Sequence, residues 1–322
     1  MTEISVCSRK GSRDTMEDTH IIDVDLMQDR TMIALYAVFD GHRGKYTSLY
    51  LQKNYADVLR SCIVKQKSLD MSENGLYESA LRDSFLQCEE GCMAELQSRL
   101  NDESAEWNVS GSTAAVVLVL NNKTVYCANA GDSEVVVGRR TINRCKTSAD
   151  KGDYDYIGIC LSTLHKPNTD LERARIDRAG GFVATTGLVA RVGGHPRHVN
   201  LSVSRSFGDS DVVGHKTQQP LIISRPDIAK TQTKDGDVII VACDGLWDVF
   251  DYRQAVREVY EHRTDMNRCN QLSQNTAEYL CNRAIDDLGS DDNVTAIVVF
   301  VSADTSKQWV IYESVEQENA KT

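Results

Sequence analysis

The sequence predicts a single domain that mixes β-strands with α-helices. Two apolar stretches rich in β-branched or aromatic residues, 34–39 and 238–243, each end at an Asp-Gly pair, and helix-like sequence follows both. A lone Asp-Gly pair is typical of a hairpin turn, but neither stretch is followed by a second alternating strand. We therefore predict two buried strands that deliver Asp40 and Asp244 to the end of a sheet. Carboxylates placed in this way can hold hard divalent cations.

The candidate ligands are spread over nearly the whole chain of 322 residues, from Asp18 to Asp292. Oxygen ligands of one Mg²⁺ must converge to about 2.1 Å from the ion. A site drawn from both ends of the chain therefore requires one compact body, although the length alone favours about two domains. A chain of this length can bury a large core.

The composition is that of an ordinary globular protein with an acidic balance. The formal net charge is −11 and the isoelectric point is about 5.2, which argues against nucleic acid or an anionic membrane as a partner. No apolar run approaches the about 20 residues of a membrane span. The N-terminus has no secretory signal, and Thr2 excludes N-myristoylation. We expect a monomer that is cytoplasmic, nuclear or both.

Ten cysteines occur in the chain. In an intracellular protein we expect them to be reduced and mostly buried. Cys88 and Cys92 are four residues apart on a predicted helix with no histidine nearby, so we interpret them as packing residues rather than zinc ligands.

The first half of the chain alternates predicted strands and helices. In order, these are a strand at 4–7, a charged segment at 10–22, a strand at 31–39, helices at 44–60 and 76–100, and a hairpin of strands at 111–120 and 124–129. Apolar residues at helical spacing predict the helices, and the Asn121-Asn122 pair predicts the hairpin turn. Asp132 follows at another strand end.

The second half continues this alternation with longer polar connections. In order, we predict a strand from Val135, a polar surface loop at 146–156, a helix at 169–179, a hairpin within 182–192, a polar insertion at 193–200, a loop at 204–209, a strand at 238–243, helices at 253–263 and 272–287, and a strand at 294–301. Gly180-Gly181 ends the helix predicted at 169–179. The insertion contains His195 and His198, which lack a cysteine at metal-binding spacing and are not expected to bind metal.

Eight short motifs follow one another along the chain. They are Arg13-x-x-Met16-Glu17-Asp18, Asp40-Gly41-His42-x-Gly44, Gly111-Ser112-Thr113-Ala114, Gly131-Asp132-Ser133, His165-Lys166-Pro167, Ser204-Arg205-x-x-Gly208-Asp209, Asp244-Gly245-Leu246-Trp247-Asp248 and Asp292-Asn293. No single motif is decisive, but the ordered set resembles the type 2C family of metal-dependent protein serine/threonine phosphatases (PPM/PP2C). The resemblance extends over about residues 7–302.

The resemblance implies an α+β fold: a four-layer α/β/β/α sandwich of two antiparallel β-sheets flanked by helices, with a dinuclear metal site at one sheet end. The catalytic domain would span 1–305, and 306–322 would be a peripheral C-terminal extension. The implied activity is hydrolysis of phosphoserine and phosphothreonine in protein substrates. The implied cofactors are two Mg²⁺ or Mn²⁺ ions, with a third ion at a weaker site.

Position within the motifs gives each acidic residue a role by resemblance. Asp40 would bridge two metal ions, and Gly41 would ligate one through its carbonyl oxygen. Asp244 and Asp292 would hold the other ion. The remaining acidic residues have weaker roles: metal-bound waters would link Glu17 and Asp18 to the ions, and the third site would be formed by Asp132 and Asp248.

The chemistry follows from these residue types. Two ions about 3.5–4 Å apart could lower the pKa of a shared water for in-line attack on phosphorus, and they would offset the charge of the phosphate. Arg13 would bind the phosphate, because the planar fork of donors of an arginine fits a phosphate group better than the ammonium group of a lysine does. His42 would protonate the serine or threonine leaving oxygen. The sequence contains no Cys-x5-Arg phosphatase loop and no Walker loop.

The chain departs from the family pattern in four places. Arg43 replaces a small residue, Glu134 replaces an arginine, Leu164 replaces an aspartate, and the stretch from 192 to 201 is longer than usual. None of these removes a metal ligand. They bear on substrate preference and on the electrostatic field at the third site.

Two alternatives stay open at this point. The first is a catalytically weak or inactive family member that acts as a regulatory scaffold, which the intact ligand set argues against. The second is a structural or calcium-buffering domain, which leaves Arg13 and His42 unexplained.

Overall fold

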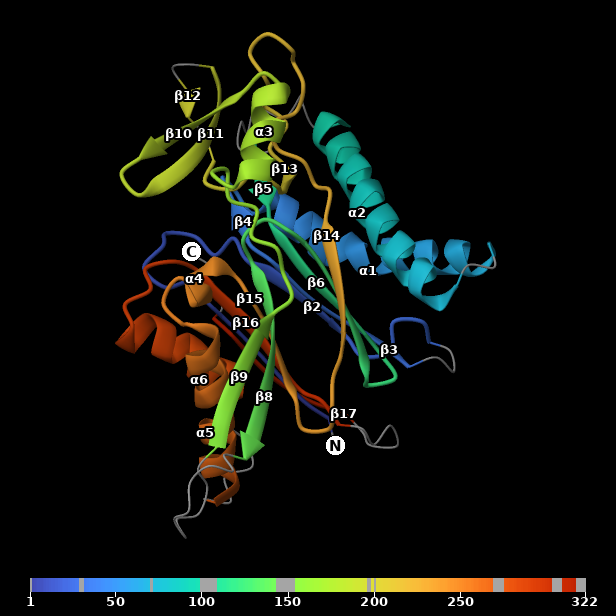
Figure 1. Cartoon of the computed structure of the whole chain (residues 1–322), viewed down its shortest axis with the longest axis vertical. Helices are drawn as coiled ribbons and strands as arrows, with labels where there is room; N and C mark the ends of the chain where they lie inside the picture. Colours follow the sequence, from blue (N-terminus) through green and yellow to red (C-terminus); the bar gives the residue numbers. More distant parts are fainter. Residues whose placement is uncertain are drawn as a thin grey trace, which may run out of the picture.

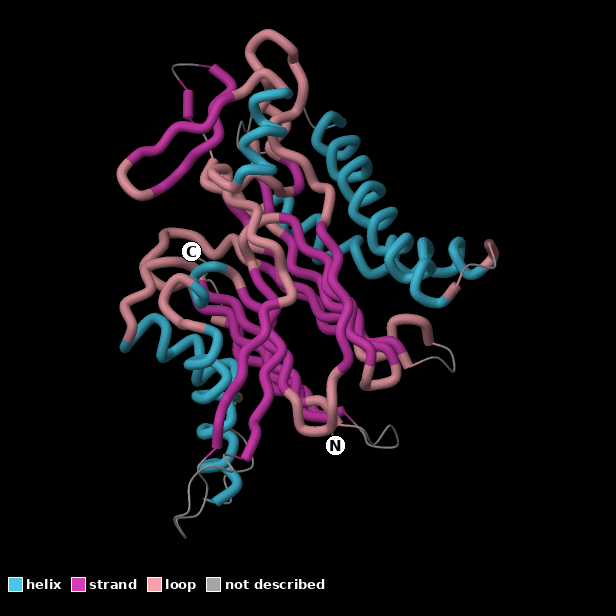
Figure 2. The backbone as a smooth tube through the Cα atoms, viewed as in Figure 1, coloured by secondary structure: helices cyan, strands magenta, loops and turns pink. Residues whose placement is uncertain are grey.

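The structure is a computed structural model that describes residues 2–28, 32–69, 72–98, 109–142, 154–195, 198–199, 201–268, 275–302 and 309–316. Two β-sheets pack face to face, and helices cover their two outer faces (Figures 1 and 2). The order of layers is therefore helix, sheet, sheet, helix, which confirms the predicted fold class.

The first sheet has six strands in the order β17-β1-β16-β15-β8-β9. Its strands are β1 (Thr2–Arg9), β8 (Glu134–Ile142), β9 (Tyr154–Cys160), β15 (Val238–Ala242), β16 (Val294–Phe300) and β17 (Trp309–Val315). Neighbouring strands pair antiparallel, except that β1 and β17 run parallel. The expectation of antiparallel sheets is wrong at this one edge, where the chain returns to lie beside its own first strand.

The second sheet has five strands in the order β14-β7-β6-β3-β2, all antiparallel. Its strands are β2 (Thr19–Asp23), β3 (Ile33–Phe39), β6 (Ala114–Leu120), β7 (Thr124–Ala130) and β14 (Asp227–Gln232). Strands β6 and β7 form the predicted hairpin. Asn121 and Asn122 occupy its turn with φ of 51° and 53°, a left-handed conformation that asparagine tolerates.

Strand β3 shows how the sequence builds the layers. Leu35 and Phe39 join the core beneath the first helical layer, whereas Tyr36 and Val38 join the core between the sheets. A strand covered on both faces is a continuous apolar run, as this one is. The helices are α1 (Tyr46–Lys67) and α2 (Glu73–Ser98) on this side, and α5 (Tyr252–Arg268) and α6 (Thr276–Asn282) on the other.

A smaller unit lies beyond the strand ends that carry the candidate ligands (Figure 1). It consists of α3 (Asp170–Arg178), β10 (Phe182–Thr186), β11 (Val189–His195) and β12 (His198–Val199). Its own core includes Ile176, Val192 and Leu221. Beside it lies a second small sheet that is formed by β4 (Gly41–His42), β5 (Gly111–Ser112) and β13 (Phe207–Gly208).

Several predicted loops contain strands. Residues 154–156 open β9, 193–195 and 198–199 belong to β11 and β12, and 207–208 form β13. The expectation of irregular structure is therefore wrong at these positions, because cross-strand pairing supplies hydrogen bonds that no local pattern reveals. Residues 146–153, 196, 197 and 200 lie outside the described residues.

Helix boundaries also shift. Helix α1 continues to Lys67, and the helix expected at 272–287 is α6 followed by a π-helix, η2 (Arg283–Asp287). Residues 99–100 and 272–274 lie outside the described residues. Part of the expected C-terminal extension forms β17 at the sheet edge, and the division of the chain at residue 305 stays a prediction.

Two expectations from composition can be compared with the structure. The eight cysteines that it describes are all free thiols, and seven are buried. No helix within the described ranges combines the length and apolar character needed to cross a membrane.

Candidate metal centre

Three carboxylates from distant parts of the chain meet at one end of the two main sheets. Asp40 follows β3, Asp132 lies in the turn between β7 and β8, and Asp244 begins the short helix α4 (Asp244–Trp247) after β15. One oxygen of each lies within 4.8 Å of the other two. The sequence placed Asp40 and Asp244 in the main site, and the structure adds Asp132 directly beside them.

Burial and mutual repulsion raise the pKa values of this cluster. Burial, together with the charges of Asp18 and Asp244, raises the pKa of Asp40 well above its usual value. Burial and then the charge of Asp132 raise the pKa of Asp244 to about 8. Bound cations would remove this repulsion, because they favour the charged form of each carboxylate.

Asp18 tests whether the centre fits metal ions. Its side chain is buried, with 6% exposed, and among the described residues neither of its carboxylate oxygens has a hydrogen-bond partner. Burial raises the pKa of Asp18 to about 6, although polar groups of Thr295, Cys243 and Asp40, too poorly placed for hydrogen bonds of standard geometry, act in the opposite direction. Buried charges are normally paired or bound to metal, so this carboxylate near Asp40 and Asp292 fits divalent cations and their water ligands.

Gly41 occupies a position where a side chain cannot fit. A Cβ atom there would lie 2.3 Å from the backbone oxygen of Glu17 and 2.8 Å from Oγ of Ser48. The glycine therefore lets the strand end at Asp40 approach the segment that carries Glu17 and Asp18. This contact joins two of the predicted ligand motifs.

Glu17 and Asp292, two further predicted ligands, line the same pocket as Asp40 and Gly41 but lie outside the group of three carboxylates. Arg13 Nη2 lies 2.7 Å from Oδ2 of Asp292, and the Arg13 side chain is 57% exposed. The carboxylate of Glu17 accepts hydrogen bonds from Thr15 and from the backbone N–H of Gly44.

Asp248 lies one helical turn after Asp244, and its backbone N–H donates to the Asp244 carbonyl at 2.8 Å. Burial raises the pKa of Asp248. Its assignment to a third metal site together with Asp132 stays a prediction.

His42 has a fixed partner. Its Nε2 lies 2.7 Å from Oδ2 of Asp209, whose side chain is fully buried, and Nη1 of Arg43 lies 3.3 Å from the other oxygen of that carboxylate. Burial alone would lower the pKa of His42, but the charge of Asp209 and the hydrogen bond to it raise this pKa. Arg43 also pairs with Asp211 through two hydrogen bonds.

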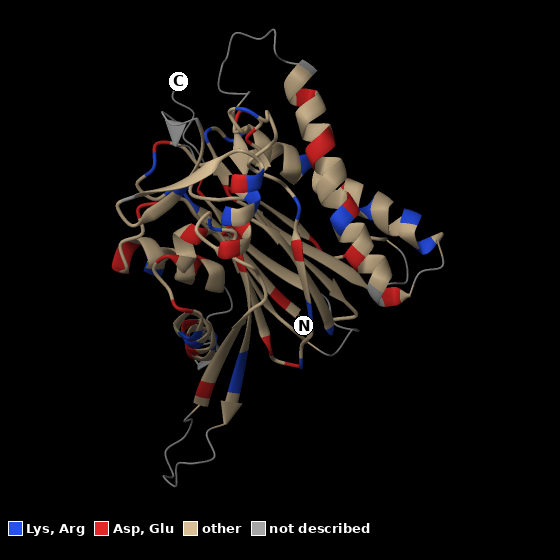
Figure 3. Ribbon diagram, turned by 45° about the horizontal axis from the view of Figure 1, so that its top comes forward, with Lys and Arg blue, Asp and Glu red and all other residues tan. Residues whose placement is uncertain are grey.

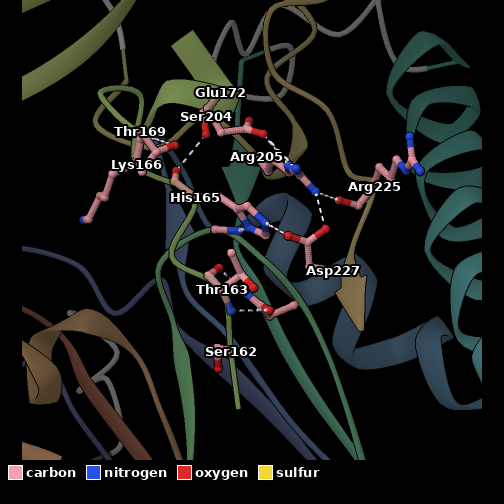
Figure 4. Close-up of polar contacts among 12 residues, drawn as sticks. Ser162, Thr163, His165, Lys166, Thr169, Glu172, Ser204, Arg205, Arg225 and Asp227 are labelled. Carbon is pink, nitrogen blue, oxygen red and sulfur yellow. Dashed lines mark hydrogen bonds and ion pairs between the residues drawn. The ribbon is translucent and has the colours of Figure 1, made fainter. Parts of the chain in front are cut away.

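Lys166 forms an ion pair with Asp132, one of the three clustered carboxylates. A polar network holds the segment around it (Figure 4). Nδ1 of His165 accepts from the Gly131 N–H at 3.1 Å, and Nε2 lies 3.2 Å from Oδ2 of Asp227. The network therefore links the Lys166 segment to the turn that carries Asp132.

Glu172 on α3 anchors the other end of this network (Figure 4). It is buried and pairs with Arg205 at 2.7 Å and with Arg175 at 2.8 Å. Burial would raise the pKa of Glu172, but the hydrogen bonds from the two arginines lower it to about 2. The α3 unit is thereby tied to the body that carries the metal centre.

The centre opens into a pocket of about 510 Å³. Its lining includes the acidic cluster and three arginines, Arg13, Arg43 and Arg191. Figure 3 shows acidic and basic residues intermixed near these strand ends. A negatively charged substrate would therefore meet positive side chains above a carboxylate floor that cations can neutralise.

Sequence reasoning gave no role to several residues of the site. They are Asp209, Lys166 and Asn293. The side chain of Asn293 forms hydrogen bonds with the backbone of Lys10, Thr15 and Glu17. The Gly-Asp pair that ends the 204–209 motif repeats the Gly131-Asp132 pattern. That repetition is the feature of the sequence that could have indicated a functional role for Asp209.

The fold and site fit a class of enzyme: a β-sandwich whose clustered carboxylates could hold metal ions beside arginine and histidine side chains. A sequence profile described as "Protein phosphatase 2C" matches residues 2–289. "Protein phosphatase 2C 1" of Paramecium tetraurelia is 32% identical over 304 residues, which cover 91% of this chain and 90% of that protein.

Solved structures agree with the fold. A serine-threonine phosphatase 2C from Toxoplasma gondii superposes with a TM-score of 0.72 at 23% identity, covering 92% of this chain and 94% of that one. A C. elegans sex-determining protein gives a TM-score of 0.70 at 26% identity, covering 92% of this chain and 64% of that one. The chain belongs to the protein phosphatase 2C family and is a metal-dependent protein serine/threonine phosphatase.

Proposed function

We propose that the carboxylate cluster holds two divalent cations for the hydrolysis of phosphoserine and phosphothreonine. The direct ligands would be Asp40, Gly41, Asp244 and Asp292, with Asp18 and Glu17 acting through water and Asp132 and Asp248 forming a third, weaker site. The observation that supports this most is the convergence of Asp40, Asp132 and Asp244 within 4.8 Å. The buried, unpartnered oxygens of Asp18 support it further.

When bound, the cations supply an activated water as nucleophile and offset the charge of the phosphate. Arg13 binds oxygens of the phosphoryl group, for which its planar guanidinium is suited. Its high exposure leaves it able to exchange Asp292, its one ion-pair partner within the described part of the chain, for the phosphate. This exchange orients the phosphoryl group over the carboxylate cluster.

His42 holds the proton that the leaving group needs. A serine or threonine alkoxide is a poor leaving group, so a general acid at this position accelerates P–O cleavage. Asp209 favours the protonated ring and fixes its orientation. His42 is therefore the proposed general acid, and Asp209 is its positioning residue.

Either Mg²⁺ or Mn²⁺ suits this ligand set, because both prefer carboxylate and water oxygens. The net charge of −11 supports a protein that acts away from nucleic acid and anionic membranes. We propose a monomer of the cytoplasm, the nucleus or both that acts on phosphorylated proteins.

Calorimetric titration with Mn²⁺ tests the ligand assignment directly. Asp40→Asn and Asp244→Asn should each weaken Mn²⁺ binding strongly. Each should also lower kcat on a phosphoserine peptide by at least about 10²-fold, because the cations both activate the attacking water and offset the charge of the phosphate. Asp291→Asn is the matched control, because Asp291 is exposed beside Asp292. Unchanged Mn²⁺ binding in both cluster variants would contradict the assignment, and a wild type that binds Mn²⁺ without turnover would indicate a scaffold.

A further inference from the structure

Strand β17 covers the outer edge of β1 although it lies well beyond residue 289, where the family match ends. The two strands pair in parallel from Thr2 and Trp309 to Ser8 and Val315. Trp309 packs against the core between the sheets. The Tyr312 carbonyl accepts a hydrogen bond from Nδ2 of Asn275 at 3.3 Å. The strand is thus held by its backbone along its whole length.

The pairing continues past the end of the strand at Glu316. The backbone N–H of Glu316 donates to the Ser8 carbonyl at 3.0 Å. Its carboxylate Oε2 accepts from the backbone N–H of Lys10, also at 3.0 Å. A charged acceptor makes this bond stronger than a neutral one. Glu316 therefore binds the first residue of the turn that leads to Arg13.

That turn is held on its other side by the 291–293 segment. The Lys10 carbonyl accepts from Nδ2 of Asn293 at 2.8 Å, and Ser12 Oγ donates to the Asp291 carbonyl at 2.7 Å. Gly11 has φ +63°, and a Cβ there would lie 2.2 Å from the Asp292 carbonyl oxygen. The turn is thus clamped between Glu316 and the segment that carries Asp292.

The clamp matters because Arg13 has little packing of its own. Its side chain is 57% exposed, and it forms an ion pair with Asp292, a carboxylate that cations would also attract. Once phosphate replaces Asp292 as the partner of Arg13, the backbone of the turn determines the position from which the Arg13 side chain extends. If the turn loses one of its anchors, the guanidinium samples more positions. Fixing it on the phosphate then costs more conformational entropy and weakens phosphate binding.

We propose that Glu316, at the end of strand β17, is a positioning residue for phosphate binding by Arg13. The C-terminal segment thereby contributes to substrate binding without touching the substrate. This inference rests on the proposed role of Arg13 as the phosphate ligand.

The experiment compares Glu316→Ala with Glu316→Gln in the full chain loaded with Mn²⁺. The readouts are kcat and KM on p-nitrophenyl phosphate, inhibition by inorganic phosphate, and Mn²⁺ affinity by calorimetry. Loss of one hydrogen bond should raise KM and the inhibition constant of phosphate about two- to tenfold, with kcat and Mn²⁺ affinity unchanged. Glu316→Gln keeps an acceptor oxygen and should recover most of the effect. Glu313→Ala is the matched control, since Glu313 lies on the same strand and pairs with His20.

A double-mutant cycle with Arg13→Ala separates the possible failures. If Glu316 acts through Arg13, adding Glu316→Ala to Arg13→Ala should change KM no further. Additive effects, or wild-type KM and phosphate inhibition in Glu316→Ala, would overturn the positioning role. Equal losses of Mn²⁺ affinity and phosphate affinity in Glu316→Ala would also overturn it. An unchanged KM in Arg13→Ala would instead show that the proposed phosphate ligand itself is wrong.

Discussion

His42 Nε2 lies 2.7 Å from Oδ2 of Asp209, 167 residues away along the chain. The two residues meet because β4 and β13 both pair with β5. Gly111 of β5 leaves room for the contact, since a Cβ there would lie 2.2 Å from both atoms. The small sheet therefore builds an imidazole–carboxylate pair at the rim of the metal centre.

The first prediction concerns the effect of this pair on the leaving group. Asp209→Asn removes the charge that favours the protonated form of His42, so kcat on a phosphoserine peptide should fall at least about tenfold. The fall should not exceed the about 10²–10⁴-fold that a general acid supplies. p-Nitrophenyl phosphate should be affected much less, because its leaving group is stable without a proton. The measurement is kcat on both substrates, with chemistry shown to limit each rate.

Asp211→Asn provides the control for this comparison. Asp211 pairs with Arg43 next to Asp209, but its side chain is 38% exposed. It should leave the ratio of the two rates unchanged. Equal losses on both substrates in Asp209→Asn would mean that Asp209 supports the fold or the metal centre rather than the proton on His42.

The second prediction uses the close approach at Gly41. Gly41→Ala would force apart the Asp40 strand end and the Glu17 carbonyl, because the new Cβ would lie 2.3 Å from that oxygen. We expect Mn²⁺ affinity to fall by about 10- to 100-fold, as for other changes that misplace metal ligands. Calorimetric titration measures it.

Gly91→Ala is the control, because its Cβ would meet only the hydroxyl end of the Tyr50 side chain, which can move. Native Mn²⁺ affinity in Gly41→Ala would show that the backbone there can shift freely and that the close approach does not matter for binding.

The third prediction concerns stability and pH at Glu172. Its pKa of about 2 lies below the usual value of 4.5, so its contribution to folding is complete above pH 4.5 and is lost as the pH falls towards 2. At pH 7, Glu172→Gln should lower the free energy of unfolding by about 2–4 kcal/mol, since it leaves two arginines less well paired. The difference from wild type should shrink between pH 4.5 and 2.

Urea unfolding at pH 7 and pH 3 measures this difference. Asp170→Asn, on an exposed position of the same helix, should match wild type at both values. A difference for Glu172→Gln that stays constant with pH would mean that the glutamate acts through shape and not through its charge.

The parts of the site that the sequence predicted are those with a local pattern. Asp40 and Asp244 stand directly after strands whose apolar runs are visible in the sequence, and the turn at Asn121-Asn122 depends on residue type alone. The resemblance to a family then supplied roles for residues such as Arg13 and His42, which no local pattern would have given.

The parts that were missed depend on contacts between distant segments. Asp209 acquires its role only when β4, β5 and β13 come together. Strand β17 was not predicted as a strand, since nothing local in 309–315 indicates that it pairs with β1. Lys166 likewise meets Asp132 only because a network of buried polar groups fixes its segment. Such partners lie 34 to 307 residues apart.

The central claim is that the carboxylate cluster binds the cations on which phosphate hydrolysis depends. The most direct test is the rate of phosphoserine-peptide hydrolysis by wild-type protein before and after its metals are removed with EDTA, and again after Mn²⁺ or Mg²⁺ is added back. The account predicts loss of activity in EDTA and recovery with either ion, whereas Asp244→Asn should stay inactive throughout the same range of ion concentrations. Full activity of the metal-stripped protein would contradict the account.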